Sequence, residues 1–310
     1  MKRILVGIDI GGTKTAVLAR EAGSDREVYS AKLKTPAKEG VGAMLRLIDE
    51  QVDSLPGGRK AMVSLGVAVP GPVDDSGHVI YAGNLVGWGD VPLRDQLEER
   101  YGVPVYVERD ANCGALGEKW LGVAKKMKDF VFLALGTGVG AGVFIEGSLY
   151  RGAHYAAGEA GDMTFLSEGT RLSDVVGKKT IKKKVKKVTG KKMSAAEALE
   201  RAEKDRSLRP VARDVVDHLG TCVVAISSLL DPEAIVFGGG TSQAGEPLLK
   251  MVRERVAPLH VVRAHLTLGE LGSAAQVYGA LWGAKQVMHA RRITRRPAAA
   301  AMRRSGSNRR

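Results

Sequence analysis

Two glycine-rich turns about 120 residues apart carry the residue types that bind phosphate. The first contains Asp9, Gly11, Gly12, Thr13 and Lys14, and the second contains Gly136, Thr137 and Gly138. Each turn lies between two apolar runs typical of β-strands. Successive glycines let backbone N–H groups face an anion, because no Cβ stands in the way. The repeated strand–turn–strand unit predicts two halves that close on one polyphosphate, as in a nucleotide-dependent phosphotransferase.

Asp9 directly precedes the first turn. A carboxylate beside a phosphate site repels the substrate unless a divalent cation lies between them. We therefore expect Asp9 to orient Mg²⁺ through water. The alternative is a tight β-hairpin with a solvated aspartate.

Asp110 follows a predicted strand at 104–108 and opens a predicted helix. Aspartate is a favoured N-cap residue, so one interpretation is that Asp110 only begins the helix. As a general base it would instead accept the proton of an attacking hydroxyl group. The spacing alone leaves these two interpretations equally open.

Polyol recognition is suggested by a second group of residues. Gly71 lies in a Pro-Gly-Pro turn after an apolar strand, and Asn84 and Trp88 follow in a glycine-rich loop. An amide and an aromatic ring suit a sugar, although an ordinary packed turn explains the same residues. Glu159 and Asp162 follow the second phosphate turn, where Glu159 either binds a sugar hydroxyl or caps a local turn.

Strands alternate with helices in both halves, which predicts an α/β fold with two domains. We expect an N-terminal domain over 1–120, a C-terminal domain over 121–290 whose last helix (274–288) can pack back on the first, and a disordered basic tail over 291–310. Helices are expected at 40–54, 92–101, 111–120, 172–189, 194–204 and 209–230, and strands include 61–69, 234–237 and 261–267.

The net charge of +13 is concentrated in two short segments. Residues 178–192 hold nine lysines and residues 291–310 hold eight arginines, so the rest of the chain is slightly acidic. A lysine-rich surface helix explains the first segment better than a polyanion site does, and specific DNA binding is not indicated. No run of eighteen apolar residues or signal peptide is evident, and Cys113 and Cys222 have no metal-binding spacing, which favours a cytoplasmic protein away from membranes.

Taken in order, these motifs resemble the ROK family of sugar kinases and sugar-responsive repressors over about residues 3–288. The resemblance implies the actin/hexokinase-like fold of two α/β domains around a cleft, hexose phosphorylation by ATP with Mg²⁺, and a homodimer or larger assembly. It favours Asp110 as the general base and implies Gly71, Asn84, Arg109, Asp110, Glu159 and Asp162 as sugar-site positions. It also implies that Gly238, Gly239 and Gly240 approach the adenosine side of the nucleotide.

Three positions depart from the family pattern. Arg109 stands where members commonly have Asn, Asp162 stands where they have a zinc-binding His, and the segment 166–174 has no cysteine. Ser173 or Asp174 takes the place of a sugar-binding Glu. Without thiolate and imidazole ligands no structural zinc is expected. A kinase for an amino sugar, a polyphosphate-dependent kinase and a non-catalytic sensor remain alternatives. ROK repressors have an amino-terminal helix-turn-helix, for which we see no space before the first strand.

Overall fold

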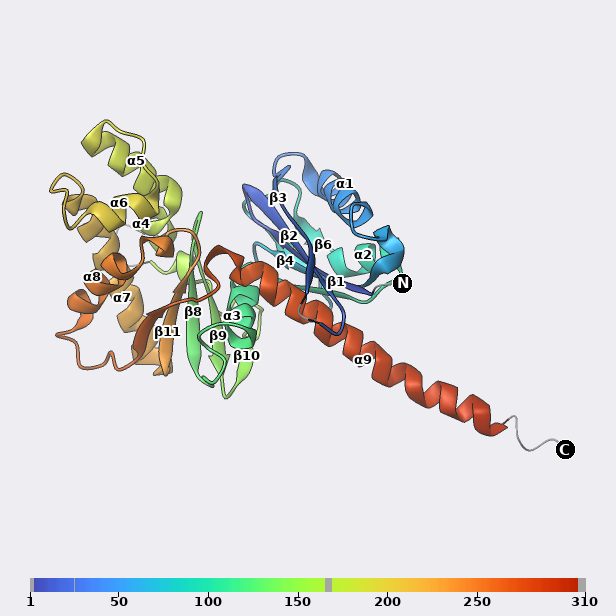
Figure 1. Ribbon diagram of the computed structural model, residues 1–310. Helices are drawn as coiled ribbons and strands as arrows, with labels where there is room; N and C mark the ends of the chain where they lie inside the picture. Colours follow the sequence, from blue (N-terminus) through green and yellow to red (C-terminus); the bar gives the residue numbers. More distant parts are fainter. Residues whose placement is uncertain (1–2, 25, 165–168, 306–310) are drawn as a thin grey trace. The chain divides into compact units, whose positions relative to one another are not determined.

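The computed structural model describes residues 3–24, 26–164 and 169–305, with side chains described as far as residue 291. It contains two compact units, Met1–Asp110 with Val277–Arg310, and Ala111–Gln276 (Figure 1). The division therefore falls at Asp110 rather than near residue 120. Its cause is helix α3 (Asp110–Trp120), which packs on the second sheet so closely that a Cβ on Gly114 would lie 2.3 Å from the Phe132 ring.

The first unit is built on a five-stranded sheet of order β3-β2-β1-β4-β7. Its strands are β1 (Ile4–Ile10), β2 (Lys14–Glu21), β3 (Glu27–Lys34), β4 (Met62–Val69) and β7 (Val105–Arg109). β1, β4 and β7 are parallel, whereas β1–β2–β3 is an antiparallel meander. Alternate side chains of β1, such as Ile8 and Ile10, join a core with Met44 and Ile48 of α1 (Gly40–Asp53). Asp9 consequently belongs to the opposite face of the sheet.

Helix α9 (Ala275–Ser305) packs on this unit through glycines that no larger residue could replace. Gly7 and Gly66 are paired across β1 and β4, and a Cβ on Gly66 would lie 1.8 Å from the Ala280 carbonyl oxygen. The Ser64 hydroxyl donates to the Ala284 carbonyl over 2.6 Å. The helix includes the part of the basic tail up to residue 305, and residues 306–310 lie outside the described part. The disorder expected for 291–310 stays a prediction.

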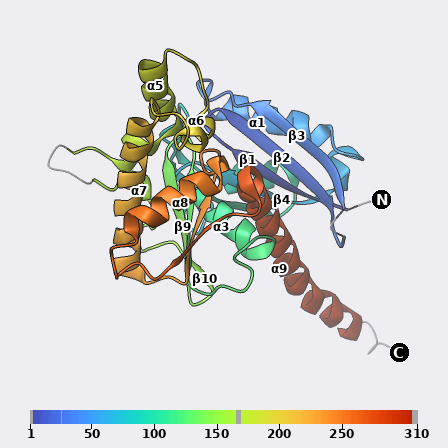
Figure 2. The ribbon, with the colours of Figure 1, turned by 60° about the vertical axis from the view of Figure 1, so that its left-hand side comes forward.

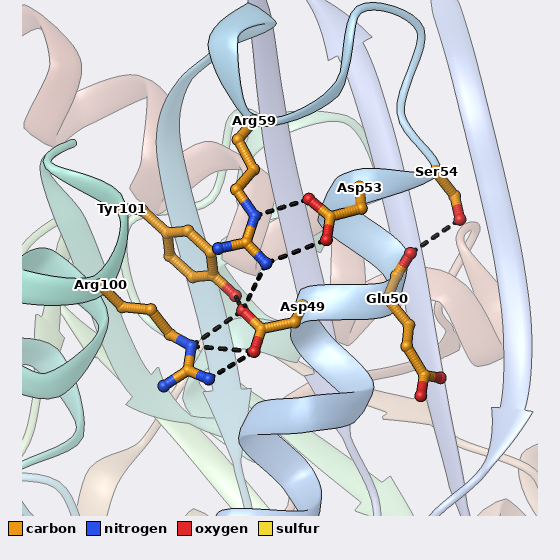
Figure 3. A network of polar contacts seen from close by, with 7 residues as sticks. All are labelled: Asp49, Glu50, Asp53, Ser54, Arg59, Arg100 and Tyr101. Atoms are coloured by element: carbon orange, nitrogen blue, oxygen red, sulfur yellow. Dashed lines mark hydrogen bonds and ion pairs between the residues drawn. The ribbon is translucent and has the colours of Figure 1, made fainter.

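A charged network fastens α1 to α2 (Leu93–Tyr101), as Figure 3 shows. Asp49 accepts hydrogen bonds from Arg100 and from the Tyr101 hydroxyl, and Arg59 approaches it to 3.2 Å. The hydrogen bond from Arg100 is the main reason that the pKa of Asp49 lies below its usual value. Burial, followed by the bond to Asp49, raises the pKa of Tyr101. These contacts hold the helices that support the sheet from its core side.

The second unit has a sheet of order β10-β9-β8-β11-β12. The strands are β8 (Phe130–Leu135), β9 (Val139–Ile145), β10 (Ser148–Tyr150), β11 (Ala234–Gly238) and β12 (His265–Leu268). Helices α7 (Arg209–Leu230) and α8 (Glu246–Val256) cover one face and α3 the other (Figures 1 and 2). Leu133 and Leu135 join the core under α7, whereas Phe132 meets α3.

Several boundaries differ from those predicted. The helix expected at 172–189 is divided at Gly177 into α4 (Leu172–Val176) and α5 (Lys178–Thr189), because Gly177 lies against two carbonyl oxygens. Helix α6 (Ala195–Arg201) begins as predicted, with the Ser194 hydroxyl accepting from the Glu197 amide. The strand expected at 261–267 is found at His265–Leu268.

Short elements complete the two units. The turn-rich stretch after Pro70 contains a hairpin of β5 (Val79–Tyr81) and β6 (Gly89–Val91) that the sequence pattern missed. Within the described ranges, four 3-10 turns were also not predicted: Gly58–Ala61, Ala160–Asp162, Ser242–Ala244 and Gly272–Ala274. Over the described residues, no helix combines the length and apolar character that a membrane crossing requires.

Candidate active site

The first phosphate loop is a short β1–β2 hairpin whose shape depends on hydroxyl groups. The Gly11 amide donates to the Lys14 carbonyl over 3.0 Å, so this amide is used within the turn. The buried Thr35 hydroxyl donates to the Gly11 carbonyl over 2.6 Å and lies 2.9 Å from the Thr15 hydroxyl. Within the described chain, the amides of Gly12 and Thr13 have no backbone acceptor. These two amides are therefore the ones that suit an anion.

Asp9 and Asp110 form a carboxylate pair beside this loop. Asp9 is half-buried near the end of β1, and Asp110 is the first residue of α3, directly after β7. Burial and then the negative charge of Asp110 raise the pKa of Asp9 to about 7, and Lys32 lowers it only in part. Two neighbouring carboxylates fit a hard divalent cation such as Mg²⁺, which prefers oxygen ligands.

The predicted sugar loop lies next to the first phosphate loop. A Cβ on Gly12 would be 3.0 Å from the Asn84 Cβ, so the turn and the Asn84 loop are in contact. Gly71 has a φ of 103°, and a Cβ there would lie 2.0 Å from the Tyr81 carbonyl oxygen. Asn84 is exposed, whereas Trp88 is buried in the core of the first unit. The structure thus favours packing rather than sugar stacking for Trp88.

The second phosphate loop joins β8 to β9 and is surrounded by close contacts. The Gly136 amide donates to the Gly138 carbonyl over 2.9 Å, which closes the turn. The Ser173 hydroxyl accepts from the Val139 amide over 3.0 Å, and the Lys178 amide donates to the Gly136 carbonyl over 3.0 Å. The loop is thus braced by α4 and by the first residue of α5, which places an electropositive helix end beside it.

The turn Gly238-Gly239-Gly240 follows β11 and lies against the end of β8. Gly239 has a φ of 86°, and a Cβ there would be 2.6 Å from the Leu135 carbonyl oxygen. The Thr241 amide donates to that same carbonyl over 2.9 Å. The structure therefore brings this predicted nucleotide segment to the second phosphate loop.

The segment that carries Glu159 is held near the second loop by Gly158 and Gly161. The Ala141 amide donates to the Gly158 carbonyl over 2.7 Å, and a Cβ on Gly161 would lie 2.3 Å from the Val139 carbonyl oxygen. The segment therefore lies flat along β9, and this close contact explains why residues 158 and 161 are glycines.

The positions that depart from the family pattern have separate environments. Asp162 and Asp174 are exposed and share Arg171, which lies 3.3 Å from Asp162 and 3.1 Å from Asp174. Ser173 instead faces the Val139 amide, so Asp174 and not Ser173 accompanies Asp162. Arg109 is only 2% exposed, and its amide donates to Glu108 over 2.9 Å. Among the described residues, no group of three or more His, Cys, Asp and Glu side chains is placed to hold a metal ion.

The sequence model of the ROK family matches residues 5–287. The chain belongs to the ROK family. A glucokinase of Halalkalibacterium halodurans is 32% identical over an alignment spanning 92% of this chain and 96% of that one. A xylose repressor of Caldicellulosiruptor bescii is 30% identical, with 81% of this chain and 69% of the repressor covered. This ROK protein is therefore similar to sugar kinases and to repressors.

The solved structures confirm the fold of the ROK protein. A ROK family glucokinase from Streptomyces griseus, in complex with glucose and AMPPNP, superposes with a TM-score of 0.80 at 26% identity, covering 91% of this chain and 99% of that one. The fold is accordingly actin/hexokinase-like, as the motifs predicted.

Sequence reasoning missed the residues that shape the loops. Thr35 lies at the end of the third strand, far from the first turn in sequence, and its role follows only from the β2–β3 pairing. Ser173 was considered as a substitute for a sugar-binding carboxylate, whereas its hydroxyl braces the second loop. A buried threonine directly before a proline, as in Thr35-Pro36, is the only signal that the sequence offered.

Proposed function

We propose that this ROK protein is an ATP-dependent kinase that phosphorylates a hydroxyl group of a hexose, with Asp110 as the general base. The observation that carries the proposal is the position of Asp110, which lies near enough to Asp9 and the first phosphate loop to raise the pKa of Asp9. A repelling carboxylate pair costs stability, and such pairs are typical of functional sites.

In the proposed reaction, Asp110 accepts the proton of the sugar hydroxyl while the hydroxyl oxygen forms a bond to the γ-phosphorus of ATP. The bond from that phosphorus to the bridging oxygen of ADP breaks, and ADP leaves. Gly12 and Thr13 bind the transferred group through their amides, and Lys14 adds a positive charge. Asp9 would hold Mg²⁺, which when bound neutralises phosphate charge.

The remaining predicted residues are divided between donor and acceptor. We assign Gly136, Thr137, Gly138 and the turn Gly238–Gly240 to the nucleotide, because the structure brings them together at the end of β8. We assign Gly71, Asn84 and Glu159 to the sugar. Arg109 and Asp162 change the hydrogen-bonding groups at the acceptor, so the sugar need not be the glucose of the relatives.

The experiment that tests the proposal separates a kinase from a sensor. Sugar and ATP affinities are measured by calorimetry, and sugar phosphate is detected by mass spectrometry, for the wild type and Asp110→Asn. We expect the variant to bind both ligands and to lose about 10²–10⁴-fold in kcat, the usual contribution of a general base. Binding without turnover in the wild type, or nearly full activity in the variant, would reject the proposal.

One observation, the lysine-rich helix α5, favours inorganic polyphosphate as an alternative phosphoryl donor. Its first amide is bonded to the second phosphate loop, and its exposed face carries two rows of lysines without an acidic residue: Lys178, Lys179, Lys182, Lys183, Lys186 and Lys187. Only Lys184 of this helix is paired, with Asp214, among the described ion pairs. A linear chain of inorganic polyphosphate matches such a face.

The polyphosphate alternative is tested by competition against Mg·ATP. Neutralising Lys182, Lys183, Lys186 and Lys187 to Gln should abolish polyphosphate binding and leave ATP turnover unchanged. The matched control neutralises Lys125 and Lys126, which are exposed on the same unit outside α5. Equal polyphosphate binding by both variants would show that α5 is only a solvated surface.

A further inference from the structure

The chain passes from one unit to the other at two places. The first connection, Asp110–Ala111, lies in the first turn of α3, and the second, Gln276–Val277, lies in the first turn of α9. Asp110, the proposed general base, is therefore the last residue before the first connection. Any movement of α3 would therefore change the position of the Asp110 carboxylate.

One buried carboxylate on the second unit links the helix that follows the first connection to the segment that precedes the second. Glu118 of α3 is 0% exposed. Its Oε1 accepts from the Leu271 amide over 2.9 Å, and its Oε2 accepts from the amides of Glu270 and Val123 over 3.2 and 3.0 Å. Glu118 thus ties α3 to the segment that leads into α9. Charged acceptors make the stronger hydrogen bonds, and losing them leaves buried amides unsatisfied.

The backbone around Glu118 is shaped to fit this carboxylate. A Cβ on Gly122 would lie 1.8 Å from Oε2, and a Cβ on Gly269 would lie 2.5 Å from Oε1. Neither glycine has a left-handed backbone, so close approach and not turn geometry requires them. Two separate segments therefore use glycine to bring their amides to one side chain.

We infer that Glu118 is a positioning residue for phosphoryl transfer, which fixes the two connections to each other and thereby fixes Asp110. It acts through α3 and through residues 269–271, without touching the substrate. On the first unit, α9 is held by Gly7, Gly66 and the Ser64 hydroxyl. We therefore expect little movement of α9 relative to the sheet of the first unit. The kinetic consequence rests on the proposed kinase function.

The test compares Glu118→Gln with a matched control, Glu233→Gln. Glu233 also accepts two backbone amides on the second unit, from Lys128 and Asp129 over 2.7 and 3.0 Å, but it lies beside neither connection. A glutamine has one acceptor oxygen and cannot bind all three amides at Glu118. We expect kcat to fall by about 10- to 100-fold in Glu118→Gln, the scale of a 1 Å misplacement, with KM for ATP unchanged.

Glu118→Asp should fall between the wild type and Glu118→Gln, because it keeps the charge on a shorter side chain, and Glu233→Gln should keep the wild-type kcat. Equal kcat in Glu118→Gln and Glu233→Gln, whatever their thermal stability, would overturn the inference. These comparisons require turnover in the wild type. If the wild type has no turnover, the kinase proposal is rejected, and the structural part of the inference, the link from α3 to residues 269–271, is decided by hydrogen exchange.

Hydrogen exchange of the wild type tests the tie itself, without turnover and without a variant that must fold. Because one carboxylate accepts all three amides, peptides spanning 118–124 and 269–272 should exchange with a common opening rate. Rapid exchange of 269–272 while 118–124 stays protected would show that Glu118 does not fasten the two segments.

Discussion

The two glycine-rich loops share a strand–turn–strand shape, yet the residues around them differ in kind. The first has ionisable groups at its base, with Asp9 before the turn, Lys14 after it and Asp110 close by. The second, Gly136-Thr137-Gly138, has none within the turn and is braced by Ser173 and by the start of α5. This contrast agrees with the proposal that the first loop serves the transfer step and the second serves nucleotide binding.

Among variants of the two loops, the largest effect is expected for Asp9→Asn, which should lower kcat by about 10²-fold because it removes a group that holds charge in place at the site. The same change should raise the melting temperature in Mg²⁺-free buffer. Repulsion between an ionised Asp9 and Asp110 destabilises the folded protein, and the neutral amide of asparagine removes this repulsion.

The pH dependence of that stability gain follows from the raised pKa. Below a pH of about 7, Asp9 is increasingly protonated in the folded state. The destabilisation that its negative charge causes therefore decreases as the pH falls from about 7 to its unfolded pKa near 4. The gain in Asp9→Asn should therefore be largest at pH 8 and smaller at pH 5. Calorimetric unfolding at the two values measures it, and a gain that is larger at pH 5 would contradict the electrostatic account.

Thr35→Val should disturb the first loop alone. The valine cannot donate to the Gly11 carbonyl, which should cost about 1–3 kcal/mol of unfolding free energy and up to about 10-fold in kcat. Chemical denaturation and steady-state kinetics measure the two effects. Thr221→Val is the control, since its exposed hydroxyl caps only the Asp217 carbonyl on α7.

Ser173→Ala should disturb the second loop alone. Loss of the acceptor for the Val139 amide should raise KM for ATP by about 5- to 10-fold, equivalent to about 1 kcal/mol, and leave kcat unchanged. Ser54→Ala, which removes a hydroxyl at the end of α1 (Figure 3), is the control. A fall in kcat with constant KM would show that the second loop also takes part in catalysis, which would contradict the proposed division of roles between the two loops.

The smallest effect is expected for Arg171→Ala. Its ion pairs with Asp162 and Asp174 join side chains that are each more than half exposed, and such pairs contribute about 0–1 kcal/mol. Stability should change little, and KM for the sugar should change by no more than about 3-fold. A much larger rise in KM would show that Arg171 holds the acceptor site.

The sequence was sufficient for features that depend on local pattern. The apolar run Ile4–Ile10 predicts the first strand, and Ser194 followed by Glu197 predicts the start of α6. Contacts between distant segments could not be predicted. The Thr35 brace, the Glu118 tie and the burial of Trp88 each depend on packing that no single segment encodes.

The measurement that tests the central claim most directly is ADP release from Mg·ATP, for the wild type beside Asp110→Asn. The panel holds glucose, mannose, fructose, glucosamine, N-acetylglucosamine and N-acetylmannosamine, with a blank that lacks sugar. The account predicts release with at least one sugar in the wild type and its loss in Asp110→Asn. Release that is the same in both proteins, or none with any sugar while ATP still binds, would contradict it.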